Sequence, residues 1–247
     1  SKTPLPIDDM VDLLKHHCVL KDTEVDAIVL WVLASYLINS FRIFPKLSLI
    51  SPEKRCGKTT TMEVIQSLSK EGVLVSSISP AALFRITEQL KPTLLIDEAD
   101  TFVSNGSQEL TGLLNSSHTR SGSTVVRCVG DDHQAKPFST WMPMVLASIG
   151  DLPDTVMDRS IVINLRRKKP HEQAARLPVD LNGIKTPLRD AVQTWCHSIE
   201  SSIHSTSVNI PRLGNDRAED NWMPLFTIAE VAGGDWPNRC ERAAKAL

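Results

Sequence analysis

Cysteines are few in this 247-residue chain, and they lie far apart. None of the five belongs to a Cys-x-x-Cys pair, and the seven histidines show no spacing typical of metal ligands. This pattern argues against a zinc site or a disulfide framework and is typical of a reducing compartment, so we expect a cytoplasmic protein. The cysteines are Cys18, Cys56, Cys128, Cys196 and Cys240.

The chain also lacks an excess of positive charge and a long apolar run. Its net charge is −2, so a nucleic-acid-binding surface would have to be local. The most apolar stretch, residues 27–41, is interrupted by Ser35 and Asn39 and is too short to cross a bilayer, so we expect no membrane partner. The first residues lack the apolar core of a signal peptide, and the last helical pattern runs to Leu247. This leaves open that further domains of a larger protein adjoin the chain.

Residues 51–60, Ser-Pro-Glu-Lys-Arg-Cys-Gly-Lys-Thr-Thr, have the pattern of a phosphate-binding loop. Gly57 lets the backbone approach an anion, Lys58 supplies a charge for the β- and γ-phosphates, and Thr59 supplies a hydroxyl for Mg²⁺. A strand pattern precedes the loop and a helical pattern follows it, so free N–H groups of the helix would face the phosphates. We therefore expect this loop to bind ATP through Lys54, Arg55, Cys56, Gly57, Lys58, Thr59 and Thr60.

The loop departs from the usual motif at its entry. Pro52 stands where the first glycine is expected, and Gly57 is the one glycine between residues 51 and 60. Proline restricts φ and removes a donor, so the entry must be shaped differently. A Gly-Lys-Thr match alone is weak evidence, and the loop needs support from elsewhere in the chain.

That support comes from residues 92–98, a short apolar run that ends in Asp97 and Glu98. Carboxylates at the end of a buried parallel strand lie at the ligand edge of an α/β sheet. Asp97 would hold Mg²⁺ together with Thr59, and Glu98 would orient the attacking water. The alternative is a strand that runs into a solvated acidic turn. The letters of 97–100 also spell the DEAD-box signature, but those helicases need two RecA-like domains, and this chain has room for one.

The remaining pattern predicts an α/β fold with a parallel five-stranded sheet. We expect an N-terminal helical segment over 1–45, an α/β core over 46–167 and a helical, lid-like region over 168–247. A β-hairpin is predicted over 124–140, between the third core helix and the fourth strand. The expected strands are 47–51, 73–77, 93–97, 143–148 and 160–165. The expected helices are two within 7–45, then 58–70, 80–89, 107–117, 152–158, 184–204, 218–232 and 236–247.

This order of elements, with a hairpin before the fourth strand, resembles the AAA+ superfamily of P-loop ATPases. More narrowly, the chain resembles a family of unknown function whose P-loop ATPases occur in phage, prophage and plasmid replication and primase–helicase proteins. The segments that carry this resemblance are 51–59, 95–100, 149–161, and the pair 217–225 with 232–236.

The resemblance implies roles for three more residues. Ser148, at the end of the fourth strand, would sense the γ-phosphate or the catalytic water. Arg159 would act as an arginine finger on the γ-phosphate of a neighbouring subunit. Arg217 would contact the γ-phosphate in cis from the lid, although Arg212 is also available. The alternatives are a plain strand-end serine, and local ion pairs of Arg159 with Asp154 or Asp158 and of Arg217 with Glu219 or Asp220.

Together these features predict an Mg²⁺-dependent ATPase that assembles into a homo-oligomeric ring, a hexamer by resemblance. It would act on DNA as a helicase- or translocase-type motor in mobile-element replication. The hairpin, through Arg127, His133 and Lys136, would touch DNA phosphates, although Asp131 and Asp132 oppose this. The alternatives are a slowly hydrolysing, nucleotide-controlled loader or binding module, and a small-molecule kinase on the same fold.

Overall fold

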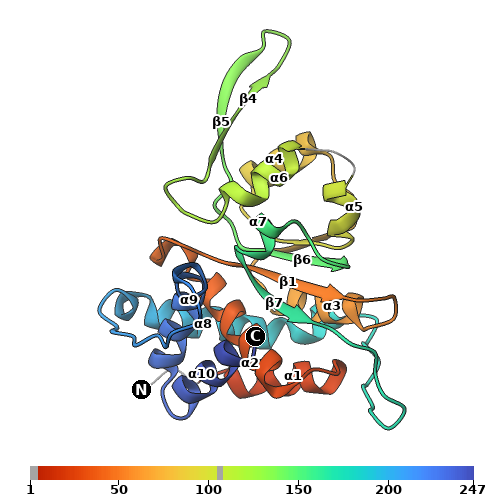
Figure 1. Ribbon diagram of the computed structural model, residues 1–247, viewed down its shortest axis with the longest axis vertical. Coiled ribbons are helices and arrows are strands. Elements are labelled where there is room, and N and C mark those ends of the chain that lie inside the picture. The colour runs from red at the N-terminus through yellow and green to blue at the C-terminus, as the bar shows by residue number, and fades with distance from the viewer. Residues whose placement is uncertain (1–4, 105–107) are drawn as a thin grey trace.

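The computed structural model describes residues 5–104 and 108–247, and its centre is a five-stranded sheet in the order β2-β3-β6-β1-β7 (Figure 1). Every neighbouring pair in this sheet is parallel. The predicted mixed α/β fold with a parallel sheet is therefore confirmed. The strands are β1 (Lys46–Ser51), β2 (Gly72–Val75), β3 (Thr93–Ile96), β6 (Met144–Ile149) and β7 (Ser160–Asn164).

Alternate residues of each strand enter two separate cores. In β1, Leu47 and Leu49 pack into one apolar cluster, whereas Ile50 packs into the other. In β6, Val145 belongs to the first cluster and Leu146 to the second. Because side chains of a strand point alternately to opposite faces, a sheet covered on both faces needs the near-continuous apolar runs seen here.

Helices cover both faces of the sheet, in the two layers visible in Figure 1. One layer holds α4 (Pro80–Leu90), α5 (Ala99–Ser104), α6 (Gln108–Ser116) and α7 (Asp154–Met157). The other layer holds α1 (Ile7–His17), α2 (Asp22–Ser35), α3 (Lys58–Leu68), α8 (Leu181–Ile203), α9 (Asp216–Ala232) and α10 (Trp236–Ala246), and a short 3₁₀ turn, η1 (Ile38–Ser40), follows α2. The second layer combines both ends of the chain in one core.

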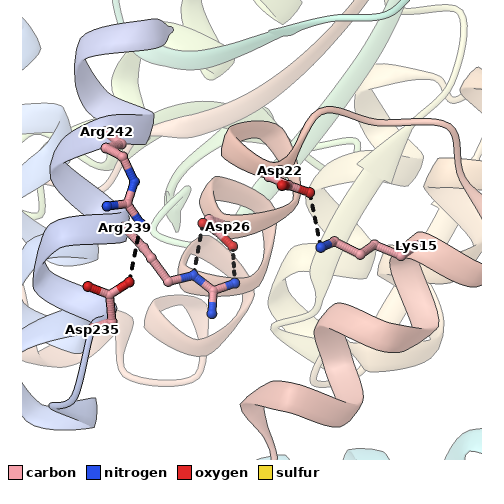
Figure 2. A network of polar contacts seen from close by, with 6 residues as sticks. All are labelled: Lys15, Asp22, Asp26, Asp235, Arg239 and Arg242. Atoms are coloured by element: carbon pink, nitrogen blue, oxygen red, sulfur yellow. Dashed lines mark hydrogen bonds and ion pairs between the residues drawn. The ribbon is translucent and has the colours of Figure 1, made fainter.

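An ion pair fastens the N-terminal helices to the last helix (Figure 2). Arg239 of α10 donates from Nη2 to Oδ1 of Asp26 at 2.5 Å and from Nε to Oδ2 at 3.1 Å. The Asp26 side chain is only 7% exposed, and the guanidinium of Arg239 also lies 3.8 Å from the ring centroid of Trp236. A bidentate pair of this kind sets the angle between two helices as well as their distance.

The predicted hairpin forms a separate antiparallel sheet from β4 (Thr124–Val129) and β5 (Gln134–Ser139). It projects away from the body in Figure 1, beyond the layer that contains α4 and α6. Gly130 and His133 adopt positive φ values of 73° and 50° at the turn, where the chain reverses direction.

Several boundaries differ from those expected. Helix α5 was not predicted, and it begins directly after the acidic end of β3. Helix α8 begins at Leu181 rather than at 184, because the Asp180 carboxylate accepts the N–H of Gly183 at 3.0 Å and caps the first turn. The expected start of the 107–117 helix at residue 107 lies outside the described residues. Within the part of the chain that the structure describes, no helix has the length and apolarity to cross a membrane.

Candidate functional site

The segment between β1 and α3 bends into a loop at the carboxyl end of the sheet. Ser51, the last residue of β1, is buried; its hydroxyl donates to the carbonyl of Ser148 at 3.3 Å, and its own carbonyl accepts the N–H of Gly150 at 2.9 Å. Gly57 precedes α3 with a left-handed φ of 75°, and Arg55 is also left-handed at 67°. These two turns let the chain reverse and start a helix within a few residues.

The N–H groups of this loop face outward from the start of α3. Thr61 makes the first helical bond, to the carbonyl of Gly57 at 3.0 Å. For the N–H groups of residues 54–60, none of the described residues supplies an acceptor. Unpaired N–H groups at a helix N-terminus carry partial positive charge and favour an anion.

Lys58 and Asp97 meet at this end of the sheet. The Lys58 ammonium lies 2.9 Å from Oδ1 of Asp97, and their side chains are 13% and 18% exposed. Asp97 directly follows β3, where its N–H continues the strand pairing by donating to the carbonyl of Val75 at 2.8 Å. Glu98 comes next, exposed and in a left-handed conformation with φ of 54°. The sheet thus brings together charges that are 39 residues apart in sequence (97 − 58).

These groups line a cleft of about 360 Å³. Its volume falls within the range of small-molecule sites. Its walls include every residue that the sequence predicts for the phosphate loop, together with both predicted carboxylates and Ile149. Cys56 turns inward, with its thiol donating to the carbonyl of Glu53 at 3.3 Å, so it packs the loop rather than reaching the cleft centre. The cleft residues predicted from sequence are Lys54, Arg55, Cys56, Gly57, Lys58, Thr59, Thr60, Asp97 and Glu98.

The donor set of the cleft suits a hard divalent cation. Thr59 contributes a hydroxyl and Asp97 a carboxylate, both oxygen ligands of the kind that Mg²⁺ prefers. Among the described residues, His, Cys, Asp and Glu do not gather in any group of three or more that would hold a metal. Two protein oxygens are sufficient for Mg²⁺, which usually completes its shell with phosphate oxygens and water.

A second cavity, of about 200 Å³, lies on the other side of the same loop. It shares Arg55, Cys56, Gly57 and Thr60 with the cleft and is closed by residues 17–19 and by the segment after β7. The carbonyl of His16 accepts the N–H of Ala175 at 2.9 Å. This hydrogen bond holds the chain around residues 17–19 against the segment that follows β7. Sequence reasoning missed this cavity, because its walls come from three separate parts of the chain.

Two side chains of this second cavity have defined charge states. Burial raises the pKa of the Cys18 thiol to about 11, so that thiol is neutral at physiological pH. Arg166 is engaged by both carboxylate oxygens of Glu172, at 2.8 and 2.6 Å. The lining of this cavity also includes Lys168 and Arg55 and, among the described residues, contains no carboxylate, whereas the cleft beside it is lined by both cations and carboxylates.

Ser148 does not border the cleft. It is fully buried, and its hydroxyl donates to the carbonyl of Gly150. The next residue, Ile149, reaches the cleft wall instead. The side chains of neighbouring strand residues alternate, and this alternation decides which of the two faces the ligand edge.

Arg159 and Arg217 lie at the opposite end of the sheet. The carbonyl of Arg159 accepts the N–H of Lys46, the first residue of β1, at 2.9 Å. At the rise of a parallel strand this end is ~17 Å from Ser51, where the loop begins. The pKa of Arg159 is lowered by partial burial and by the nearby charge of Arg217, which places the two guanidinium groups close together.

The local ion pairs considered for these arginines do not form. Arg159 donates from Nη1 to the carbonyl of Thr155 at 2.8 Å, and no ion pair joins it to Asp154 or Asp158 in the described structure. Glu219 accepts instead from the N–H of Leu213 at 3.3 Å. Among the described residues, neither Arg159 nor Arg217 therefore forms an ion pair with an acid.

The hairpin cations, in contrast, are paired. Arg127 lies 2.7 Å from Oε1 of Glu109, and its guanidinium stacks 4.3 Å from the ring centroid of Phe84. Lys136 lies 2.6 Å from Oε1 of Glu88. Two of the three hairpin cations thus hold the hairpin onto the α4 and α6 layer.

Comparisons with known proteins each cover about a third of the chain. A family described as "Protein of unknown function (DUF3631)" matches residues 164–247, which include the predicted family segments 217–225 and 232–236. An uncharacterized 28.9 kDa protein in the xis 5′ region of Saccharopolyspora erythraea is 34% identical over 86 residues. That alignment covers 34% of this chain and 31% of the relative. The family match begins after the cleft residues, so it carries no information about them.

Proposed function

We propose that this chain is an Mg²⁺-dependent ATPase of the AAA+-like P-loop type. One observation carries the proposal: the Lys58 ammonium, at the N-terminus of α3, is paired with the Asp97 carboxylate in a cleft whose loop residues have unpaired N–H groups. A cation and helix N–H groups favour phosphate, and a carboxylate beside a hydroxyl favours Mg²⁺. Neither feature alone selects a nucleoside triphosphate, but the two together do.

Each cleft residue then has a role in the proposed reaction. The N–H groups of residues 54–60 and the Lys58 ammonium bind the β- and γ-phosphates. Thr59 and Asp97 would hold Mg²⁺, and the ion would supply positive charge to the phosphate oxygens. Glu98, exposed at the rim, orients the attacking water and accepts its proton. The second cavity accommodates the nucleobase, because it adjoins the phosphate loop.

The strand order supports the same class. Strand β6 lies between β1, which leads into the phosphate loop, and β3, which ends in the carboxylates. An added strand between these two is the feature for which additional-strand P-loop ATPases are named. The predicted hairpin directly before β6 agrees with the AAA+-like order of elements.

We further propose that the ATPase assembles into a ring and acts on DNA. Arg159 is separated from the cleft of its own chain by the length of β1, ~17 Å. This distance supports action of Arg159 on a neighbouring subunit. The proposed action on DNA rests on the resemblance to replication proteins. The hairpin contributes little to it, because Arg127 and Lys136 are already paired with acids. Stimulation of turnover by single-stranded DNA would support this part.

A slowly hydrolysing switch is the second candidate, and the shape of the loop favours it. Arg55 adopts a left-handed φ that costs a non-glycine residue about 1 kcal/mol or more, and Pro52 removes a donor at the entry. A loop under such strain binds phosphate with less freedom to adjust. This candidate predicts tight ATP binding and ATP-dependent assembly, with little turnover and no strand separation.

Turnover of ATP with Mg²⁺ is the test of the proposed function. Lys58→Ala and Glu98→Gln are each expected to lower kcat by about 100-fold or more, as removal of a single group that stabilises the transition state does elsewhere. Arg242→Ala is the control, because this exposed arginine of α10 does not line the cleft. If Lys58→Ala and Glu98→Gln both hydrolyse ATP at the wild-type rate, the assignment is refuted.

A further inference from the structure

A cavity of about 370 Å³ lies at the amino end of the sheet, opposite to the phosphate-loop cleft. Its lining includes Thr93, the first residue of β3, and Pro143, which directly precedes β6. Because the strands of the sheet are parallel, the cleft lies at the other end of these strands. We call this space the hairpin-base cavity, because its lining also includes Pro137, Phe138 and Ser139 of β5, the strand that joins the projecting hairpin to the body in Figure 1. None of its lining residues has a role in the proposed ATPase reaction.

Flat aromatic side chains make up much of this lining. Tyr36 follows α2, Phe138 belongs to β5, and Trp141 lies between β5 and β6. The Tyr36 hydroxyl already donates to the carbonyl of Leu68 at 2.6 Å, so the polar end of this residue is occupied. Met142 adds a flexible thioether, which adapts to irregular gaps. Since aromatic rings stabilise other rings beyond the area that they bury, the lining favours a ligand with a flat ring.

Positive charge at the mouth of the hairpin-base cavity is uncompensated. Lys70 and Lys91 are exposed lining residues, and neither forms an ion pair to an acid within the described part of the chain. Their backbones lie close together, because the carbonyl of Lys70 accepts the N–H of Thr93 at 3.2 Å and Lys91 closely precedes Thr93. Glu88, the acid of the lining, is already neutralised, because its Oε1 lies 2.6 Å from the Lys136 ammonium. The mouth therefore favours an anionic group.

The surroundings of the hairpin-base cavity suit a small anion better than a nucleic-acid strand. The cavity volume lies at the lower end of the range for small-molecule sites, which suits one or two fused rings. An adjoining cavity, which shares Lys70, is lined by the acids Glu71 and Asp190. Two further acids, Asp131 and Asp132, lie in the turn between β4 and β5. These acids oppose a polyanion, whose binding depends on several cations along its path.

We propose that the hairpin-base cavity binds a small aromatic anion, a planar system of one or two rings that carries a single carboxylate or phosphate group. The ring packs among Tyr36, Phe138 and Trp141, and the anionic group meets the ammonium groups of Lys70 and Lys91 at the mouth. Since the lining combines residues of β5 and α4, the ligand holds the base of the hairpin against the body. This site goes beyond the proposed ATPase function and does not depend on it.

Isothermal titration calorimetry without nucleotide tests the class of ligand. The probes are a naphthalene carboxylate, the corresponding naphthyl alcohol and the fully saturated carboxylate. The naphthalene carboxylate is expected to bind about 10-fold more tightly than the alcohol, because two exposed ion contacts favour its charge. It is expected to bind about 5-fold more tightly than the saturated carboxylate, because only a flat ring stacks on aromatic side chains. Equal affinities for the three probes, or no binding of any of them, would overturn the proposal.

Substitutions at the mouth test which residues form the site. Lys70→Met and Lys91→Met each keep an aliphatic stem and are expected to weaken binding of the naphthalene carboxylate about 3-fold, and about 10-fold together, with no change for the alcohol. Asn39→Trp, at an exposed lining position, is expected to fill the cavity and abolish binding of both probes. Lys245→Met is the control, because it removes an exposed charge of α10. If Lys245→Met weakens binding as much as the cavity variants do, net charge attracts the probe and the site is wrong.

Amide hydrogen exchange locates the bound probe. Saturating naphthalene carboxylate is expected to slow exchange in β5 and in the last turn of α4, and to leave the phosphate loop unchanged. Slower exchange confined to the phosphate loop, or to the groove between α1 and α8, would place the probe elsewhere and overturn the proposal. A single-stranded oligonucleotide that protects β5 where the carboxylate does not would assign the cavity to nucleic acid, which also overturns it. Because no nucleotide is added, these outcomes are independent of ATP hydrolysis.

Discussion

In the wall of the cleft, the Lys58 ammonium lies 2.9 Å from Oδ1 of Asp97, and the N–H of Glu98 donates to the same oxygen at 2.8 Å. The group proposed for phosphate and the group proposed for Mg²⁺ thus neutralise each other directly. A nucleotide with its metal must exchange this one ion pair for two separate interactions, so phosphate and metal binding are coupled through Lys58 and Asp97.

Asp97→Asn is expected to uncouple them. The ratio of ATP affinity with Mg²⁺ to ATP affinity with EDTA should fall about 10-fold or more, because a hydrogen bond or ion contact to a charged group contributes about 1.5–3 kcal/mol. Binding in EDTA should hold or improve, since Lys58 loses its competing carboxylate. A fluorescent ATP analogue gives both affinities. Glu98→Gln, at the next position, should leave the ratio unchanged; an unchanged ratio in Asp97→Asn would contradict the metal assignment.

Gly57→Ala is expected to lower the free energy of unfolding by about 1 kcal/mol through backbone strain alone. Gly57 has a φ of 75°, but an added Cβ would meet no atom within 4 Å, so no clash contributes. Gly112→Ala is the matched control, because it lies within α6 and also has open space; there alanine should stabilise by about 0.5–1 kcal/mol. Chemical denaturation measures both. Equal effects at the two positions would show that the left-handed φ of Gly57 is not needed.

Arg239→Met is expected to destabilise the fold by about 3 kcal/mol, because it leaves the buried Asp26 carboxylate without its partner. The neighbouring pair in Figure 2, Arg242 with Asp235 at 3.2 Å, has side chains that are 62% and 63% exposed. Arg242→Met should therefore cost less than about 0.5 kcal/mol. The double variant Asp26→Asn with Arg239→Met should recover most of the loss. If the double variant is no more stable than Arg239→Met alone, the uncompensated charge is not the cause.

His118 is expected to make stability depend on pH between about 6.5 and 3. Burial, followed by the charges of Lys46, Arg159 and Arg217, lowers its pKa from 6.5 to about 3 in the folded chain. Above pH 6.5 neither state is protonated and the stabilisation is fully present. As the pH falls toward 3, the unfolded chain takes up a proton that the folded chain does not, so stability is lost.

The variant His118→Gln should flatten that part of the profile, measured by denaturation at a series of pH values. His204→Gln is the control, because His204 is exposed at the end of α8. The same slope in His118→Gln and in the wild-type chain would mean that His118 does not carry this dependence.

Much of the architecture was predictable because it depends on local pattern. Apolar runs and helical spacing located all five strands of the parallel sheet, with ends that differ by at most two residues. Helix α5 escaped prediction because it is short and begins at the acidic turn itself. The loop and the two carboxylates were found together because their strands end at the same edge of a parallel sheet.

The positions of single side chains were less predictable. Ser148 was expected to end its strand, but β6 continues to Ile149; the Ser148 hydroxyl bonds to Gly150, and Ile149 reaches the cleft. Arg217 was expected near the phosphate loop, and it lies beside Arg159. A strand's register and the packing of a distant helix decide these outcomes, and neither is written in the local sequence.

The sequence by itself therefore determined most of the helices and strands, the loop after β1 and the carboxylates that follow β3, since periodicity and chain direction suffice for these. Only the tertiary structure decided which groups from distant segments meet. It joined residues 17–19 to the segment after β7, Asp26 to Arg239, and His118 to Lys46 and Arg217. These long-range contacts depend on how two helical layers pack against one sheet. Packing involves the whole chain, so a local sequence pattern does not predict it.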